Sequence, residues 1–180
     1  SKGRRRLYYP EFDAPETHDG VVWDADTDRY AAFMAGLDSR DLSARFVFNR
    51  RDKRIPTASF DTHFGDRETR TEDTRAFFVL QYRHDFRHQW NLMARSYFDV
   101  YNDDGTYTYN YSEDDIPYLV ANIDIVRSHW WGGETQVTRT LGGRHRLIAG
   151  FDWRYAFRAD MQNYDAAPDY YSYLDVRRNP

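Results

Sequence analysis

Hydrophobic and polar residues alternate along much of this chain, most clearly over 146–158. One row consists of Leu147, Ala149, Phe151, Trp153, Tyr155 and Phe157, and the other of Arg146, Ile148, Gly150, Asp152, Arg154, Ala156 and Arg158. Successive residues of a strand point to opposite faces of a sheet. The pattern therefore predicts a strand with one apolar face and one mostly polar face.

The same two-row pattern recurs before this stretch. It is found at 42–49, 75–83 and 92–101, more weakly at 29–37 and 131–140, and a short strand is predicted at Arg5 to Tyr9. The weaker rows include Ala31, Phe33, Ala35 and Leu37 in the first case and Trp131, Gly133, Thr135 and Val137 in the second. We therefore expect about seven strands, most of them near the 9–11 residues that a tilted strand needs to cross a bilayer.

The links between these strands alternate in length. Short links lie around 38–40, 85–89 and 142–144, whereas the long links are 11–27, 52–71, 102–127 and 159–180. Short turns at one end and long loops at the other are typical of outer-membrane barrels. The prediction is an all-β, antiparallel up-and-down segment of a transmembrane β-barrel, with short periplasmic turns and long extracellular loops. The alternative is a soluble sandwich or lipocalin-type barrel that binds a small ligand or glycan, with the two faces reversed.

Aromatic and charged side chains fit the membrane interpretation. Tyr82, Phe86 and Trp90 flank a short link, and Phe98, Trp131, Tyr155 and Phe157 lie toward the long links, as the two aromatic girdles of a membrane protein would. A one-residue slip of 146–158 would turn Asp152 and Arg154 toward the apolar side. An arginine there costs about 2–4 kcal/mol at the bilayer midplane. Stretch 128–140 fits less well, because Thr135 falls on its apolar row.

Composition excludes several function classes. The 180 residues are 18% aromatic, carry a formal net charge of −4 and include no cysteine. Aromatic residues favour strands, and the negative charge gives no reason to expect a nucleic-acid partner. Disulfides, thiol catalysis and cysteine zinc sites are excluded. No apolar run reaches the roughly 18 residues of a membrane helix, and no signal peptide is visible at the N-terminus.

Four phrases of the sequence resemble the barrel of bacterial TonB-dependent outer-membrane receptors. They are Leu7-Tyr8-Tyr9-Pro10-Glu11-Phe12-Asp13, Arg54 to Phe60 with the following Phe64-Gly65-Asp66, Trp130 to Thr138, and His145 to Asp165. The resemblance extends over nearly the whole chain. They are strand phrases typical of the family rather than catalytic signatures.

This resemblance implies a barrel of 22 strands, an N-terminal plug, and a short box that binds TonB. It also implies uptake of a scarce solute such as a siderophore, cobalamin or a glycan across the outer membrane of a Gram-negative bacterium. Neither plug nor box is visible, and about seven strands cannot close such a barrel. We therefore expect residues 1–180 to be the front part of the barrel domain, with outer-membrane lipid, a small extracellular ligand and, through a plug outside this chain, the TonB complex as partners.

Candidate chemistry is sparse. Tyr107, Tyr109 and Tyr111 with the acidic Asp114 and Asp115 are the candidate ligand surface, although alternation at 107–111 equally fits a strand that continues above the membrane. Asp24, Asp26 and Asp28 have the spacing of hard oxygen ligands for calcium, but the full twelve-residue loop pattern is absent. The inward charges Arg75, Arg95, Asp99, Glu134, Asp152 and Arg154 are expected to form networks in the wall or to contact a plug.

No catalytic motif is present, so we predict no enzyme and no cofactor. The enzymatic alternative is an outer-membrane hydrolase that uses Ser59 and His63.

Overall fold

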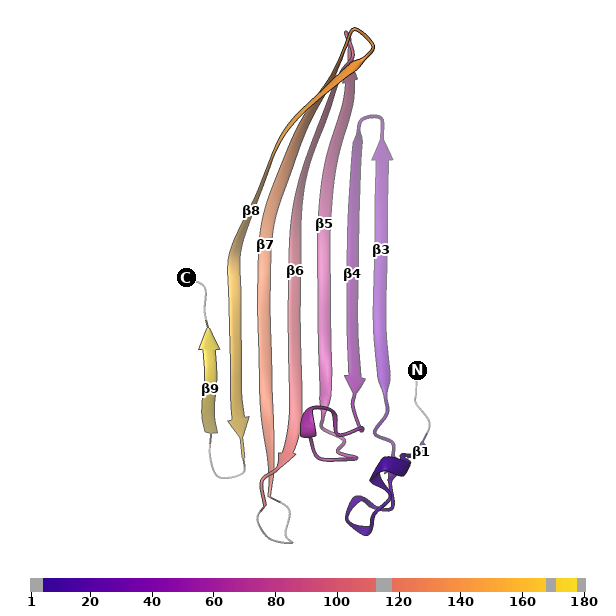
Figure 1. Ribbon diagram of the computed structural model, residues 1–180, viewed down its shortest axis with the longest axis vertical. Helices are drawn as coiled ribbons and strands as arrows, with labels where there is room; N and C mark the ends of the chain where they lie inside the picture. The colour runs from indigo at the N-terminus through magenta and orange to yellow at the C-terminus, as the bar shows by residue number, and fades with distance from the viewer. Residues whose placement is uncertain (1–4, 113–117, 168–170, 178–180) are drawn as a thin grey trace.

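The computed structural model describes residues 5–112, 118–167 and 171–177, and these fold almost entirely as β-strands. Seven antiparallel strands follow one another in a single up-and-down sheet (Figure 1). The strands are β3 (Asp28–Ser39), β4 (Leu42–Arg54), β5 (Arg70–Phe86), β6 (Trp90–Asn110), β7 (Leu119–Leu141), β8 (His145–Ala166) and β9 (Tyr171–Arg177). In the described residues no helix is long and apolar enough to cross a membrane.

The all-β, antiparallel up-and-down prediction is confirmed, but the sheet is open, with β3 and β9 as its two edges. Six of the predicted strands are contained in β3 to β8, whereas the seventh lies outside the large sheet. The predicted strand at Arg5 to Tyr9 is β1 (Arg6–Tyr8), which pairs with β2 (Val21–Trp23) in a separate two-stranded sheet. The seventh strand of the large sheet is β9, which lies in a stretch that we had predicted to be a loop.

Several strands extend well beyond their predicted ends. β6, β7 and β8 have 21, 23 and 22 residues. The predicted loops over 102–127 and 159–180 are therefore wrong in large part, because the ladder between β6 and β7 continues to Asn110 and Leu119. The short links lie where they were predicted, and each joins two neighbouring strands at the same end of the sheet (Figure 1).

The register brings the predicted apolar rows together on one face. Ala35, Phe46, Phe78, Phe98, Trp131 and Tyr155 are successive cross-strand partners from β3 to β8. We call this the outer face, and we call its apolar part the apolar band. The band comprises Phe33, Ala35, Leu37, Leu42, Ala44, Phe46, Phe48, Ala76, Phe78, Leu80, Tyr82, Phe86, Trp90, Leu92, Ala94, Ser96, Phe98, Val100, Trp131, Gly133, Thr135, Val137, Leu147, Ala149, Phe151, Trp153, Tyr155 and Phe157.

One residue changes face relative to the prediction. The ladder between β7 and β8 shifts between His129 and Trp130, so that Trp130 pairs with Ala156 but His129 pairs with Arg158. This β-bulge leaves Phe157 as an extra residue, and its ring packs against Phe98 on the outer face with a centroid distance of 5.8 Å. Arg158 therefore shares the outer face with Phe157 instead of belonging to the polar row.

A small folded unit lies at the long-link end of the sheet. It consists of residues 5–27 and 55–69 and is called the rim module here. It contains β1, β2 and the short 3-10 helices η1 (Pro10–Phe12), η2 (Pro15–Thr17) and η3 (Ser59–Asp61). Its core is formed by Val22, Ala25 and Phe64, with Phe12 stacked on Phe64 at 4.1 Å between ring centroids.

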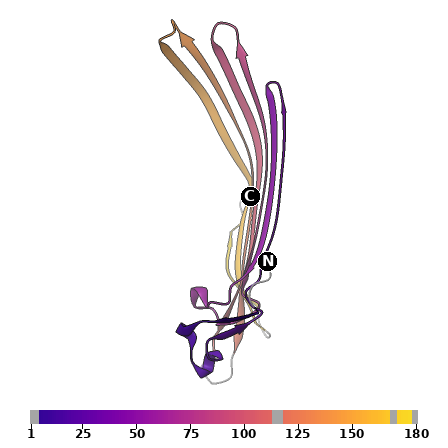
Figure 2. The same cartoon turned by 90° about the vertical axis from the view of Figure 1, so that its right-hand side faces the viewer.

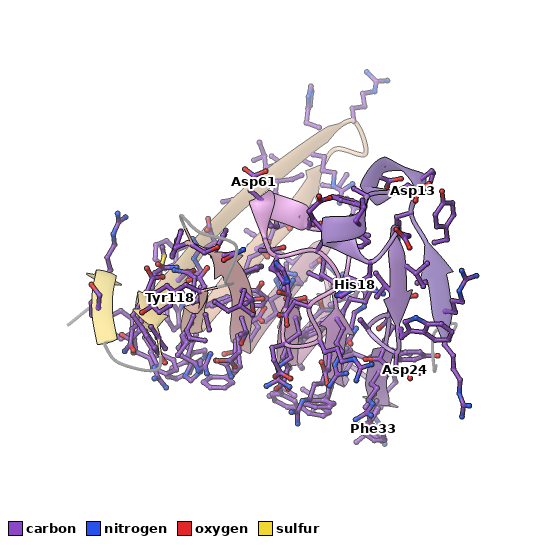
Figure 3. The ribbon with its side chains drawn as sticks, turned by 90° about the horizontal axis from the view of Figure 1, so that it is seen from below. Asp13, His18, Asp24, Phe33, Asp61 and Tyr118 are labelled. Atoms are coloured by element: carbon purple, nitrogen blue, oxygen red, sulfur yellow. The ribbon has the colours of Figure 1, made fainter. Side chains whose placement is uncertain are left out.

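The rim module lies on the inner side of the sheet, at its long-link end (Figure 2). Figure 3 shows Asp13 and Asp61 on one side of the sheet and Phe33 on the other. Figure 2 shows that the sheet is curved, and that the short turn between β7 and β8 leans to the side on which the module lies. The module therefore marks the concave side of the sheet.

The rim module requires a glycine at position 20, because its φ is +67° and a Cβ atom would lie 2.4 Å from the carbonyl oxygen of Tyr9.

The large sheet is one layer thick over most of its length. Among the described residues the buried hydrophobic side chains are Val22, Ala25, Phe64 and Val120, whereas Phe151 is 69% exposed and Leu37 is 68% exposed. The total accessible surface is 12934 Å², whereas a folded monomer of 21.6 kDa is expected to expose about 9,200 Å². Nothing in the described chain covers the apolar band.

Candidate functional site

Polar and charged side chains gather on the inner face, opposite the apolar band. The predicted wall networks are present in part: Arg75 lies 3.3 Å from Asp99, and Arg95 lies 2.7 Å from Glu134, its direct cross-strand partner. Asp38 and Arg45 form a further pair at 2.7 Å. The inner face therefore satisfies many of its charges within the sheet.

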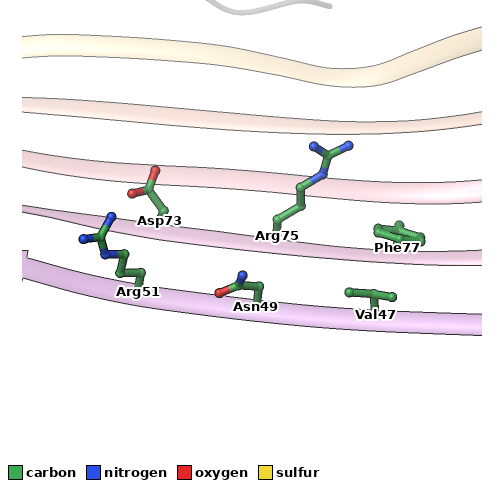
Figure 4. Close-up of a pocket in the computed structure, with 6 residues that line it drawn as sticks. All are labelled: Val47, Asn49, Arg51, Asp73, Arg75 and Phe77. Atoms are coloured by element: carbon green, nitrogen blue, oxygen red, sulfur yellow. The ribbon is translucent and has the colours of Figure 1, made fainter. Parts of the chain in front are cut away.

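The best-formed hollow on this face lies between β4 and β5 and has a volume of about 430 Å³. Its lining is Val47, Asn49 and Arg51 from β4, and Asp73, Arg75 and Phe77 from β5 (Figure 4). Hydrogen-bond donors and acceptors therefore stand beside two apolar side chains. Such a surface suits a polar solute with some apolar area.

Next to this hollow, carboxylates and tyrosines from three strands come together. We call Asp73 (β5), Tyr101, Asp103 and Tyr107 (β6) and Asp124 (β7) the carboxylate–tyrosine cluster. Asp73 and Asp103 are direct cross-strand partners, and the Tyr101 hydroxyl donates to Asp73 Oδ1 at 3.4 Å. Of these residues only Tyr107 belongs to the predicted ligand surface. Asp73 and Asp124 lie on other strands than Asp103 and share no local spacing with it, so the alignment of the strands alone brings the three carboxylates together.

Burial and neighbouring negative charge favour protonation in this cluster. Partial burial, a hydrogen bond with Asp73 and the charges of Asp73, Asp124 and Asp104 raise the pKa of Asp103 to about 7. Burial and the charges of Asp103 and Asp124 also raise the pKa of Tyr107. The carboxyl group of Asp103 is therefore partly protonated near neutral pH.

Two of the three predicted tyrosines lie in a strand that continues beyond the apolar band, and not in a loop. Tyr107 and Tyr109 lie in β6 on the inner face, and Tyr111 directly follows its end. The rings of Tyr109 and Tyr111 stack with 6.0 Å between centroids, and Tyr107 meets Phe60 of the rim module edge-on at 6.0 Å. Asp114 and Asp115, the acidic part of the predicted ligand surface, lie outside the described residues.

The rim module is fastened to β6 by a buried polar network. Asp66 Oδ2 accepts hydrogen bonds from the backbone N–H groups of Glu68 and Thr69 and from the Thr69 hydroxyl, at 2.8–3.1 Å. The His63 N–H donates to the Thr108 carbonyl at 2.6 Å, and the Thr108 N–H donates to the Thr69 hydroxyl at 3.2 Å. Burial opposes ionisation of Asp66, but hydrogen bonds from Thr108, Thr69 and Glu68 hold its pKa below the usual value.

Two of the three calcium candidates are paired with basic side chains. Asp26 pairs with Lys53, and Asp28 receives a two-pronged hydrogen bond from Arg51 at 2.7 and 3.1 Å, which lowers the pKa of its carboxyl group. In the described part of the chain no group of three or more acidic or histidine side chains is arranged to hold a metal ion. These contacts favour the structural role of two of the carboxylates over calcium binding, which stays a prediction.

The Ser59 hydroxyl lies 3.1 Å from the Thr57 hydroxyl. That contact supplies no base for a hydrolase, and the absence of enzymatic activity stays a prediction.

Compared with models of protein families, with curated proteins and with solved structures, the chain gives no significant match.

Proposed function

We propose that the seven-stranded sheet is part of the wall of a transmembrane β-barrel in a Gram-negative outer membrane, and that this barrel is a TonB-dependent receptor for a scarce solute. The observation that carries the proposal is the apolar band, which is wide, continuous across six strands and uncovered. Its exposed aromatic and aliphatic side chains form a surface far larger than the apolar patches of soluble monomers. A hydrocarbon environment would stabilise this surface.

The height of the apolar band supports a bilayer as the covering medium. Between the Phe86–Trp90 row near the short turns and the Phe48–Ala76 row, six outer-face rows follow one another at two-residue intervals. Five steps of about 6.8 Å extend about 34 Å along a strand. At the usual barrel tilt of 35–45°, this corresponds to about 26 Å along the membrane normal, close to the roughly 25 Å apolar band of outer-membrane barrels.

Charged residues limit the band sharply at its long-link side. The next outer-face rows contain Arg50, Glu72, Asp104, Arg127 and Asp160. Arg50 pairs with Glu72 at 2.7 Å, and Arg127 pairs with Asp104 at 2.6 Å. Within the band, the Ser96 hydroxyl accepts from Trp131 Nε1 at 2.7 Å and donates to the Gly132 carbonyl at 3.3 Å. Polar groups on a lipid-facing surface need such internal partners.

The inner face would line the wet interior of the barrel. Arg75 and Arg95 each form an ion pair on this face. The hollow and the carboxylate–tyrosine cluster lie toward the long-link end, which we take as the extracellular end. We place the first contacts of the incoming solute there, and the solute class is a siderophore, cobalamin or a glycan. The resemblance noted in the sequence supports energy coupling to the TonB complex through a plug outside this chain.

The two edges of the sheet favour completion by further strands. Unpaired N–H and C=O groups along an edge strand cannot be tolerated in hydrocarbon. β3 therefore needs a neighbouring strand beyond this sheet. At the other edge β9 pairs only with Met161–Ala166, past the apolar band, so the part of β8 that lies within the band needs a neighbouring strand as well.

Site-directed spin labelling tests the membrane assignment, and the absence of cysteine from the chain makes single labels straightforward. Cysteines placed one at a time along 148–156 would carry a nitroxide, and collision with oxygen and with a water-soluble nickel complex would be measured in membranes that contain the protein. We expect oxygen contact to peak at Phe151, Trp153 and Tyr155 and nickel contact to peak at the positions between them.

The soluble binding module predicts a different profile. Labels at Phe151, Trp153 and Tyr155 would then be shielded from both reagents in a particle that needs no detergent. Fractionation of cells that make the protein gives a second measurement, and recovery in the soluble periplasmic fraction would contradict the proposal.

A further inference from the structure

The short-turn border of the apolar band contains an arginine without a carboxylate partner. Arg139 of β7 is the cross-strand partner of Trp90 and of Leu147 on the outer face, in the last row of the band. Its guanidinium carbon lies 4.8 Å from the centre of the Trp90 ring. Within the described residues its buried Nε has no hydrogen-bond acceptor, and no carboxylate lies within ion-pair distance of its guanidinium.

At the opposite border the outer-face arginines next to the band are paired. Arg127 meets Asp104 at 2.6 Å, and Arg158 meets Asp160 at 2.8 Å. A guanidinium has five N–H donors and always carries its charge. Arg127 and Arg158 therefore have an anionic partner within the sheet, whereas Arg139 has none among the described residues.

The surroundings of Arg139 are basic as well. The neighbouring short turns carry Arg87 and Arg144, and Arg146 lies at the start of β8. The nearby Asp85 accepts a hydrogen bond from Asn91 at 2.5 Å. Elsewhere the chain is acidic, since its formal net charge is −4. The short-turn end is thus complementary to an anionic surface.

We propose that Arg139, stacked on Trp90, binds the phosphate of an anionic phospholipid in the leaflet at the short-turn end, and that the basic turns add attraction to that leaflet. This inference rests on the proposed membrane assignment. The row that holds Arg139 ends the apolar band, which is the depth at which headgroup phosphates begin. A tryptophan ring favours the same depth, and the aromatic face stabilises the guanidinium in a partly desolvated position.

The test compares two kinds of vesicle, one of phosphatidylcholine alone and one that also contains phosphatidylglycerol. The complete barrel that contains this sheet and its variants are allowed to insert into each, and the partition coefficient is measured by flotation. Because each variant is reported as the ratio of its two coefficients, a general loss of folding cancels. Arg139→Gln should lower this ratio by about fivefold, which is the effect of one basic residue near an anionic surface.

The double substitution Arg158→Gln with Asp160→Asn is the matched control, because it removes a paired outer-face arginine at the opposite border without changing the net charge. Its ratio should equal that of the unchanged chain. Arg139→Lys should retain part of the preference, since the charge remains but the planar stack on Trp90 is lost.

Inorganic phosphate added to the vesicles should not compete, because the site requires a phosphate held at the edge of the hydrocarbon. Competition by inorganic phosphate would overturn lipid docking in favour of a free-anion site. An unchanged ratio for Arg139→Gln, in vesicles that the chain enters normally, would overturn this inference and leave the membrane assignment standing. Failure of the unchanged chain to enter either vesicle would overturn both.

Discussion

The two faces of the seven-stranded sheet are built by the same strands, but their side chains find partners in different places. On the inner face Arg95 meets Glu134 and Arg75 meets Asp99, so the sheet itself supplies the counter-charges. On the outer face large side chains such as Phe151 and Leu37 remain mostly exposed. The charges of the inner face therefore find partners within the chain, whereas the apolar side chains of the outer face contact the membrane that we propose around them.

The largest expected effect comes from a charge placed on the outer face at mid-height. Leu80 lies in the fourth row from the short turns, and Leu80→Lys should lower the free energy of unfolding in lipid vesicles by about 2–4 kcal/mol. Gln81 is adjacent but faces inward, opposite Arg95, so Gln81→Lys should cost less than about 1 kcal/mol through like-charge contact. Denaturant titration followed by tryptophan fluorescence measures both. Equal costs at the two positions would contradict the assignment of the faces.

The second prediction compares alanine substitutions at two glycines of β7, one on each face, which lie close to aromatic rings. On the inner face, a Cβ at Gly132 would lie 2.4 Å from the Tyr97 ring and 2.8 Å from the Trp153 carbonyl oxygen. On the outer face, a Cβ at Gly133 would lie 2.8 Å from the Trp153 indole nitrogen. Each alanine should destabilise the sheet by about 1–3 kcal/mol through overpacking.

Relief by a second substitution should differ between these glycines. Trp153→Leu should restore much of the stability of Gly133→Ala, because its closest obstacle is a side chain. Tyr97→Leu should restore less of the stability of Gly132→Ala, because a backbone carbonyl remains in the way. Denaturant titration of the four variants provides the comparison, and full recovery in both cases would show that the backbone approach at Gly132 does not limit packing.

These glycines also show where sequence reasoning succeeded. Trp131, Gly133, Thr135 and Val137 were predicted as one row despite the weak alternation of this stretch, and the register places them together on the outer face. Alternation was reliable wherever one face was apolar, because each shift by one residue would exchange the faces.

The wrong predictions concern the parts of the strands beyond the apolar band, where the two faces no longer differ in polarity. Beyond the apolar band β6 is polar on both faces, as at Asp103 and Asp104, and β7 has apolar residues on both faces, as at Ile125 and Val126. The hydropathy pattern therefore no longer marks a strand although the ladder continues. The bulge at Phe157 was missed for a related reason: an extra residue in one strand leaves the two-row pattern before it intact. The carboxylate–tyrosine cluster depends on the alignment of three strands and has no local signature.

The third prediction concerns the cross-strand ion pair of the inner face. Arg95 and Glu134 are partly exposed, with side-chain exposures of 45% and 29%, and their charged groups meet at 2.7 Å. A double-mutant cycle with Arg95→Gln and Glu134→Gln should give a coupling free energy of about 0.2–1 kcal/mol, and added salt should lower it. A coupling that salt leaves unchanged would instead indicate a desolvated pair, and therefore an inner face that is closed to water.

The smallest effect is expected from the protonation of Asp103, because this residue is only partly buried. An unfolded aspartate has its usual pKa of 3.8, whereas Asp103 in the folded sheet has a pKa of about 7. The folded state thus binds the extra proton between these values, so its stability should rise as the pH falls from 8 through 7 toward 4. Asp103→Asn should be more stable than the unchanged chain at pH 8 and should lose this part of the pH dependence, as measured by denaturant titration at several pH values. Asp160→Asn, a change on the outer face outside the cluster, is the control and should keep the slope, whereas a slope that survives Asp103→Asn would assign the proton to another group.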